Sequence, residues 1–465
     1  MVRGEAKMTA VAAELAWREG DTASAIETAD RILTEGTDQD CLAAGVAAAA
    51  AAADGALFDA AARWRVIAGS LSGAPGVAAA ARAALAACLA GDLSSAAEDL
   101  AAARARLSGA APRGLTVLLD GVDAALEAVR GSFAPAARKL AGLAAATVPA
   151  DPMAAEQWGD LAVTALVAGG HDASAAELLA MFADRPTPRR HLLTAWLHLR
   201  AGRLAAARTE IAACTTPVLR RDAVLAAAVT IGLARRAGDD EALRATWRRV
   251  APVVAGVDVE PLLLDAWGEL SAGAGSAFER DTIVDAMTTA VGRVGAAWCV
   301  ETDNWWRVQR AVVAGDTSLV VELTVEPRAS AARMWASILT GDVNPVAVTE
   351  VADLLAHAGH PWDAMALCGA AAARMSNPAD ARELLSTGRA LRARIGTEDN
   401  GPGDGLSKRE RAVGELLLEG MTHKEIGARL YISPKTVEQH VAKIRQKLAV
   451  GGRAELIASL RARLA

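Results

Sequence analysis

The sequence predicts an all-α protein, in which a long α-solenoid of helical hairpins precedes a small four-helix domain containing a helix-turn-helix. Three observations lead to this fold class. From Ala10 to about Ile395 nearly every segment is rich in Ala, Leu, Arg and Glu, with apolar residues at helical spacing. Within that stretch a glycine recurs at a nearly constant interval. The last sixty residues carry the start and stop signals of several short helices.

A recurring glycine marks the turn of each predicted hairpin. The first seven of these glycines are separated by 35, 36, 40, 39, 32 and 36 residues, which is the period of a helix-turn-helix solenoid. In seven of the nine segments an alanine stands five residues after the glycine. The glycines are Gly20, Gly55, Gly91, Gly131, Gly170, Gly202, Gly238, Gly315 and Gly359, and the alanines are Ala25, Ala60, Ala96, Ala136, Ala175, Ala207 and Ala364.

This pattern resembles tetratricopeptide repeats, in which the glycine joins two helices and the small residue lets them approach closely. The resemblance implies about ten degenerate hairpins over residues 1–395. The period lapses between Gly238 and Gly315, where SAGAGS at 271–276 predicts a loop. The segment GTEDNGPGDG has no apolar residue, and it predicts a flexible linker at 396–405 before a second domain at 406–465.

Two capping boxes mark helix starts in the second domain. Ser407 is followed by Glu410, and Thr422 by Glu425, so each pair can satisfy backbone N–H groups at a helix start. Gly420 lies where the first helix must stop, because glycine reaches positive φ without strain. The sequence therefore predicts two short helices separated by a turn.

A third helix begins at Ser433-Pro434, which supplies an N-cap and a preset φ. Only Tyr431 and Ile432 separate it from the second helix. Two helices joined by so short a turn form a helix-turn-helix, whose second helix is shaped to enter the DNA major groove.

The third helix divides into an apolar and a polar face. Its apolar stripe, at i, i+4, i+7 and i+11, is Val437, Val441, Ile444 and Leu448. The opposite side, where bases would be read, carries Lys435, Glu438, Gln439, Ala442 and Gln446. The flank between the two faces carries Thr436, His440, Lys443 and Lys447. Gln pairs with adenine, Glu accepts from cytosine, and Lys reaches guanine or phosphate, so this polar side is suited to base contacts.

The stretch resembles the LuxR-type helix-turn-helix domain of bacterial transcription regulators. The residues that carry the resemblance are Glu410, Leu416, Leu417, Gly420, Lys424, Glu425, Ile426, Leu430, Ile432, Ser433, Thr436, Val437, His440, Val441, Ile444, Lys447, Leu448 and Val450. The resemblance implies that the helix containing TVEQH reads bases. Phosphate contacts are expected at Thr422, Lys424, Ser433, Thr436, His440, Lys443 and Lys447. Two residues depart from the pattern: Gly414 replaces a larger apolar residue, and Ala442 a base-contacting Lys of some members.

A fourth helix, from Arg453 to Ala462, places four aliphatic residues on one face: Leu456, Ile457, Leu460 and Leu464. Part of this face is expected to close the small domain. The resemblance implies that the helix also dimerises, which would place two recognition helices on half-sites about one helical turn apart.

The charges divide between the two predicted domains. The whole chain has a net charge of −6, whereas residues 406–465 hold five Lys and seven Arg against six Glu, a net +6. The other 405 residues therefore carry −12. An acidic body repels DNA phosphate and favours contact through the basic domain alone.

Composition indicates a cytoplasmic protein without a metal, a cofactor or membrane contact. The five cysteines are far apart and form no C-x-x-C, which argues against a zinc site and against disulfides. The longest uncharged stretch, Cys41–Ala53, is too short to span a bilayer.

No nucleotide-binding P-loop and no catalytic arrangement occur, so we expect no enzyme activity. In DRPTPRR, Arg185, Arg189 and Arg190 are expected in a solvated loop.

Four tryptophans fall in the irregular part of the solenoid: Trp298, Trp305, Trp306 and Trp335. They could line a pocket for a small effector or a partner's peptide, or they could fill the solenoid core.

Together these features predict a transcription regulator that binds double-stranded DNA as a homodimer. An effector or protein partner on the solenoid would control it, and RNA polymerase is a further candidate partner. The alternative is a scaffold protein whose solenoid recruits other proteins. In that case DNA binding serves only to tether the scaffold.

Overall fold

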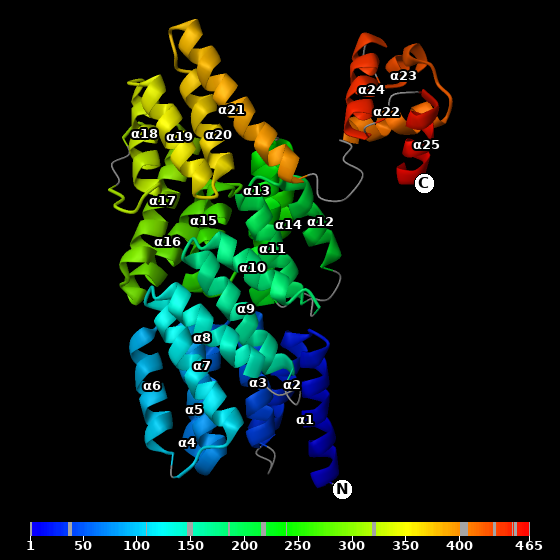
Figure 1. Cartoon of the computed structure of the whole chain (residues 1–465). Coiled ribbons are helices and arrows are strands. Elements are labelled where there is room, and N and C mark those ends of the chain that lie inside the picture. The colour runs from blue at the N-terminus through cyan, green and yellow to red at the C-terminus, as the bar shows by residue number, and fades with distance from the viewer. Residues whose placement is uncertain are drawn as a thin grey trace. The chain divides into compact units, whose positions relative to one another are not determined.

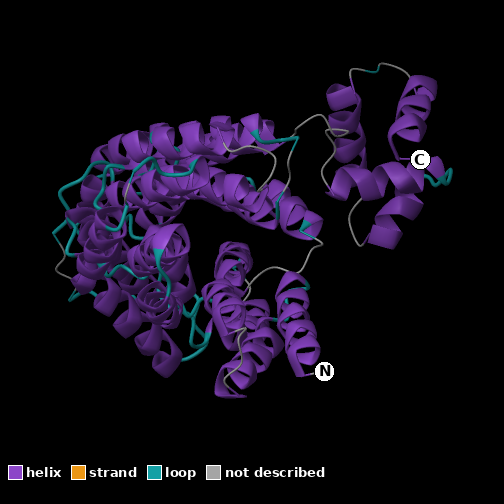
Figure 2. Ribbon diagram, turned by 90° about the horizontal axis from the view of Figure 1, so that it is seen from below, coloured by secondary structure: helices purple, strands orange, loops and turns teal. Residues whose placement is uncertain are grey.

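The chain is all-helical in the part that the computed structural model describes (Figure 1, Figure 2). The described residues are 2–35, 40–107, 109–146, 152–184, 187–214, 220–238, 240–318, 322–399, 408–430, 434–448, 450 and 453–464. Contacts divide the chain into two compact units, Met1–Arg392 and Ala393–Ala465. We call them the helical-repeat unit and the C-terminal unit.

Paired antiparallel helices build the first part of the helical-repeat unit (Figure 1). The pairs are α1 (Val2–Arg18) with α2 (Thr22–Glu35), α3 (Asp40–Asp54) with α4 (Leu57–Ser70), α5 (Gly73–Leu89) with α6 (Leu93–Ala105), α7 (Arg113–Val129) with α8 (Phe133–Ala146), α9 (Pro152–Ala168) with α10 (Asp172–Met181), α11 (Pro188–Arg200) with α12 (Leu204–Ala213), and α13 (Arg220–Ala237) with α14 (Asp240–Val254). The predicted glycine lies in the turn of every pair.

All nine predicted turn glycines adopt positive φ, from +66° at Gly315 to +102° at Gly131. Most residues are strained in this region, whereas glycine enters it freely. All seven alanines five residues further on are 0% exposed. A larger side chain at those positions would push the two helices of a hairpin apart. The hairpin pattern predicted from the sequence is therefore confirmed.

The regular pairing lapses after α14, as expected. The following elements are η1 (Pro261–Leu263), α15 (Leu264–Ala272), α16 (Ala277–Val294), α17 (Ala297–Ala314), α18 (Arg328–Thr340), α19 (Pro345–His357), α20 (Pro361–Ala372) and α21 (Pro378–Asp399). The loop expected at 271–276 is shorter by two residues because α15 continues through Ala272. Ser276 caps α16 by accepting a hydrogen bond from the backbone of Glu279.

The segment after α14, in which the regular pairing lapses, packs against the turns of hairpins near the start of the chain. We call it the irregular segment. The backbone N–H of Asp258 donates to the carbonyl of Gly55 at 2.9 Å. The Arg293 guanidinium donates to the carbonyl of Ala90 at 3.2 Å. The Trp298 indole donates to the carbonyl of Val129 at 2.9 Å. Three successive hairpin turns thus receive hydrogen bonds from one segment that lies some 170 to 200 residues further along the chain.

Two expectations about loops need correction. Arg189 and Arg190 are buried in α11 instead of lying in a solvated loop, at 8% and 6% exposure. Arg189 pairs with Asp222 at 2.6 Å and Arg190 with Asp160 at 2.7 Å, carboxylates that neighbouring hairpins supply. The linker expected from residue 396 begins inside a helix, since α21 runs through Asp399. The rest of that linker, residues 400–405, lies outside the described residues.

No helix in the described ranges combines the length and apolar character needed to cross a membrane.

Candidate nucleic-acid interface

Four helices form the C-terminal unit's small domain: α22 (Lys408–Leu418), α23 (His423–Leu430), α24 (Pro434–Leu448) and α25 (Arg453–Leu464). Their aliphatic side chains share one core. Gly420 ends α22 as predicted, with φ of +83°, and the N–H of Met421 donates back to the Leu416 carbonyl at 3.1 Å. This closure turns the chain sharply into α23.

A reciprocal cap begins α23 at the predicted Thr422. The Thr422 backbone N–H and hydroxyl both donate to the Glu425 carboxylate at 2.7 Å, and the Glu425 N–H donates to the hydroxyl at 3.4 Å. These hydrogen bonds lower the pKa of Glu425. They also engage the Thr422 hydroxyl, whereas the side chain of the neighbouring Lys424 is exposed. The other predicted cap residue, Ser407, lies outside the described residues.

The apolar stripe of α24 faces the core as predicted. Val437 and Ile444 are 0% exposed, and Val441 and Leu448 are also buried. They pack with Val413 and Leu417 of α22 and Ile426 of α23. This packing fixes the rotation of α24 about its axis, and so decides which residues face outwards.

The residues predicted to read bases lie on the outside of α24. Lys435, Glu438, Gln439 and Ala442 are all exposed, as is Lys443, whereas Thr436 and His440 are half-buried on the flank. The side chains of Gln446 and Lys447, and the whole of Tyr431–Ser433, lie outside the described residues. This face is available to a ligand as far as the C-terminal unit is described.

Arg445 is a cation on this helix that the sequence reasoning missed. It follows Glu438 by seven residues, so both project from the same side of α24. Its side chain is half-buried, and its Nε has no hydrogen-bond partner. The spacing of seven residues from Glu438 could have shown from the sequence that Arg445 lies on the same side of the helix.

The last helix contributes mainly to the core. Leu456 and Leu460, expected on a dimer face, are 1% and 0% exposed and pack inside the domain. Ile457 is only half-buried, and the side chain of Leu464 lies outside the described residues. Among the described residues of the expected dimer face, Ile457 is therefore the one that remains partly accessible.

Of the four tryptophans expected around an effector pocket, two line one pocket and two do not. Trp305 and Trp306 of α17 line a pocket in the helical-repeat unit, but Trp298 and Trp335 do not. Trp298 packs edge-on against Phe133, with ring centroids 5.0 Å apart, and fastens the irregular segment to the α7–α8 turn. Trp335 is buried in the same core cluster as Trp305 and Trp306, but it does not line the pocket. Both serve the packing role that was the alternative interpretation.

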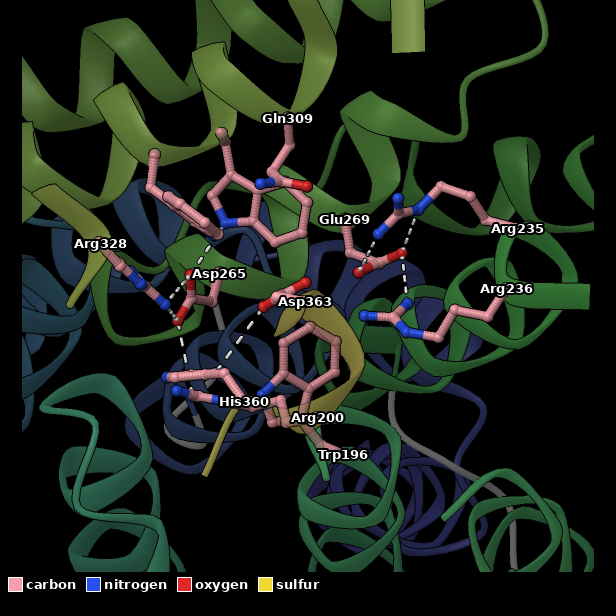
Figure 3. Close-up of a pocket in the computed structure, with 12 residues that line it drawn as sticks. Trp196, Arg200, Arg235, Arg236, Asp265, Glu269, Gln309, Arg328, His360 and Asp363 are labelled. Carbon is pink, nitrogen blue, oxygen red and sulfur yellow. Dashed lines mark hydrogen bonds and ion pairs between the residues drawn. The ribbon is translucent and has the colours of Figure 1, made fainter. Parts of the chain in front are cut away.

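The pocket is lined by side chains from six helices, seven of them charged, and we call it the charged pocket (Figure 3). Its lining residues are Trp196 and Arg200 of α11, Arg235 and Arg236 of α13, Asp265 and Glu269 of α15, Trp305, Trp306 and Gln309 of α17, Arg328 of α18, and His360 and Asp363 of α20. Its open volume is about 30 Å³, room for about two water molecules.

Two carboxylates in the charged pocket are tightly held. Glu269 pairs with Arg235 at 2.8 Å and with Arg236 at 2.9 Å. Burial alone would raise the pKa of Glu269, but these two guanidinium groups outweigh it and hold the pKa at about 2. Asp265 accepts from the Trp306 indole at 2.8 Å and pairs with Arg328 at 3.2 Å.

The third carboxylate of the pocket is poorly paired. Among the described residues, the one ion-pair partner of Asp363 is His360, at 3.9 Å, and no arginine lies within ion-pair distance. Burial raises the pKa of Asp363 despite the opposing charges of Arg236 and Arg235. Burial also lowers the pKa of His360 well below its ordinary value, so the imidazole is neutral. The sequence could not show that these residues share one pocket, since the lining residues come from positions 196 to 363 along the chain.

Comparisons with known proteins agree with the geometry of the small domain. Residues 404–460 match the family described as "Bacterial regulatory proteins, luxR family". The spore germination protein GerE of Bacillus subtilis is 49% identical over 55 residues, which are 12% of this chain and 74% of GerE. The transcriptional regulatory protein UhpA of Escherichia coli is 51% identical over 57 residues, 12% of this chain and 29% of UhpA.

A putative HTH-type transcriptional regulator of Mycobacterium bovis is 38% identical over 52 residues, 11% of this chain and 6% of that protein. The aligned stretch thus spans most of GerE but less than a third of UhpA and little of the mycobacterial regulator.

Proposed function

This chain belongs to the luxR family of bacterial regulatory proteins, and we propose that it regulates transcription as a homodimer that an effector or partner controls through the helical-repeat unit. DNA binding follows from the family. The choice of bases, the homodimer and the control by a ligand are our proposals.

The division of α24 into two faces carries the proposal. Its aliphatic stripe is buried in the domain, and the side chains of Lys435, Glu438 and Gln439 are exposed on the opposite side. A carboxamide can pair with adenine, a carboxylate can accept from cytosine, and an ammonium can donate to guanine. The exposed methyl of Ala442 suits contact with a thymine methyl group. We therefore propose that these four residues face the base edges.

Cations beside this face would hold the phosphates. Lys443 lies on the flank of α24, and Lys424 lies in the first turn of α23; both are exposed. Thr436 and His440 lie between the base-reading face and the core. Backbone N–H groups at the starts of the two helices add partial positive charge where phosphates would lie.

A homodimer would present two copies of α24 to successive turns of the major groove. Because Leu456 and Leu460 are used in the core, the proposed contact on α25 uses Ile457 with the exposed residues around it. Half-sites separated by about 10 base pairs centre to centre would fit such a pair.

Selection of DNA from a random library by the full-length chain tests the proposed function. We expect enrichment of a two-fold symmetric sequence, and a complex with two chains per duplex in analytical ultracentrifugation. Recovery of unenriched DNA, or binding that is equal for all sequences, would contradict base reading. A specific complex with one chain per duplex would contradict the dimer alone.

A further inference from the structure

The last helix of the helical-repeat unit, α21, carries three exposed arginines on one side, which we call the arginine face (Figure 1). They are Arg382, Arg389 and Arg392. Among the residues that the structure describes, no carboxylate lies within ion-pair distance of any of the three. Arg382 Nε donates to the Pro378 carbonyl at 2.9 Å, and Arg389 Nε donates to the Leu385 carbonyl at 3.2 Å. Because a guanidinium has five N–H donors, these exposed groups keep most of their donors for another partner.

The packing of α21 creates the arginine face. Leu384 and Leu391 are seven residues apart, are 0% and 3% exposed, and belong to a core cluster with side chains of α18, α19 and α20. At about 100° per residue, Arg382 and Arg389 lie on the side of the helix opposite this pair, and Arg392 lies on their flank. The burial of the two leucines therefore fixes the direction in which the arginines project.

The arginine face contrasts with the charge of the body that carries it. Residues 378–395 hold four Arg against one Asp and one Glu, a net +2, whereas the whole chain before residue 406 carries −12. Two exposed arginines on other helices have carboxylate partners: Arg65 pairs with Asp99 at 2.9 Å, and Arg333 with Glu326 at 3.0 Å. A patch of cations without such partners on an acidic body attracts a polyanion to that place.

The position of α21 in the chain determines which polyanion the arginine face can reach. α21 ends at Asp399, and α22, the first helix of the small domain, begins at Lys408. The nine residue steps from 399 to 408 span at most about 30 Å. Arg392 lies about 10 Å before the end of α21, because a helix rises about 1.5 Å per residue. The covalent chain thus keeps Arg392 within about 40 Å of the small domain, the length of roughly 12 base pairs.

We propose that the arginine face of α21 contacts the phosphates of the DNA duplex beside the sequence that α24 binds. This inference deepens the proposed function and rests on it. A guanidinium suits a phosphate because it can donate two parallel hydrogen bonds, and such contacts carry no base information. The short connection also raises the effective concentration of the second contact once the first has formed. The helical-repeat unit therefore adds affinity for the flanking duplex, in spite of its overall negative charge.

The affinity of the full chain for two duplexes tests this contact. The short duplex contains only the sequence that the chain selects, and the long duplex adds about 12 base pairs of unrelated sequence on each side, the reach of the arginine face. We expect the wild type to bind the long duplex about ten-fold or more tightly than the short one at low salt, because it neutralises additional phosphates. We call this difference the flank gain.

The triple variant Arg382→Gln, Arg389→Gln and Arg392→Gln should lose the flank gain and keep its affinity for the short duplex. On the long duplex the slope of log affinity against log salt should fall by about two to three units per chain, because three phosphate contacts are lost. Glutamine is a good helix former and the three positions are exposed, so this variant should fold as the wild type does.

The matched control is the triple variant Arg31→Gln, Arg138→Gln and Arg208→Gln. It removes the same charge from exposed positions on three separate helices, α2, α8 and α12. This control should keep the flank gain.

Absence of a flank gain in the wild type overturns the contact, and so does an equal flank gain in the two triple variants. If the α21 variant keeps the flank gain but sediments differently from the wild type without DNA, the arginine face serves a second copy of the chain, which also overturns the contact. Failure to prefer the selected sequence over unrelated DNA, with binding of the long duplex still weakened in the α21 variant alone, overturns the proposed base reading and leaves the phosphate contact supported.

Discussion

Gln439 and Glu438 are neighbours on the exposed face of α24, and their exposure depends on residues that face the other way. Val437 and Val441, one residue before Glu438 and two after Gln439, are buried and fix the rotation of the helix. The base specificity that we propose at these positions therefore depends on the aliphatic stripe as well as on the polar side chains.

Replacing Gln439 or Glu438 by Ala should relax the base preference at one position of each half-site. Each good side-chain pair with a base is worth roughly 1–3 kcal/mol of discrimination. Competition binding with single-base variants of the selected sequence measures this preference. A uniform loss of affinity over all variants would contradict direct base contact.

Lys443→Ala should weaken binding to all sequences by a similar factor, because a phosphate contact carries no base information. The slope of log affinity against log salt should fall by about one unit per half-site. Lys139→Ala is the matched control, since Lys139 is an exposed lysine of the helical-repeat unit. An unchanged slope in Lys443→Ala would place this side chain away from the phosphates.

The hairpin is the unit of construction at the level of elements. In seven of the nine predicted hairpins, a glycine makes the turn and an alanine in the second helix lets the two helices lie close together. Ala96 of α6 is 0% exposed at such a crossing, whereas Ala102 of the same helix faces solvent. Identical residues within one helix thus have different packing constraints.

Ala96→Leu should lower the free energy of unfolding by about 1–3 kcal/mol, because the inserted atoms have no space between the helices. Ala102→Leu, the matched control, should change it by less than about 0.5 kcal/mol, since leucine is also a good helix former. Urea denaturation followed by circular dichroism measures both. Equal stability of the two variants would show that the crossing at Ala96 is not tight.

In the helical-repeat unit as a whole, buried ion pairs join helices of different hairpins. Glu269 of α15 is held by Arg235 and Arg236 of α13, and Asp265 by Arg328 of α18. A buried carboxylate that lost its arginines would be strongly destabilising. These pairs therefore make the register between hairpins specific.

The stability that Glu269 contributes should depend on pH in a defined direction. Its pKa is about 2 in the folded chain and about 4.3 when unfolded, so the contribution is complete above pH 4.3 and is lost as pH falls towards 2. Buried Asp160 and Asp172, whose pKa burial raises, act in the opposite direction. The contribution of Glu269 must therefore be measured as the difference in the free energy of unfolding between the wild type and a variant without this carboxylate.

Glu269→Gln supplies that difference. At pH 7 the free energy of unfolding of the variant should be lower than that of the wild type by roughly 3–5 kcal/mol, because two arginines lose their buried partner. This difference in the free energy of unfolding should become smaller as pH falls from 5 to 2. Denaturant titrations at several pH values test this, and a gap that stays constant would contradict the low pKa of Glu269.

The sequence by itself determined whatever depends on neighbours along the chain. Helical periodicity predicted the buried stripe of α24, capping chemistry predicted the start of α23 at Thr422, and glycine spacing predicted the hairpin turns. These signals are local because a helix places residues three and four apart on one face, and a turn is made by the residues within it.

Only the tertiary structure decided which distant residues meet. It placed Arg189 and Arg190 in the core beside carboxylates of other hairpins, used Leu456 and Leu460 to close the small domain, and separated Trp298 from Trp305 and Trp306. It also gathered the charged pocket from α11 to α20. A sequence shows the charge of each side chain, but the curvature of the stacked hairpins decides whether that charge has a buried partner.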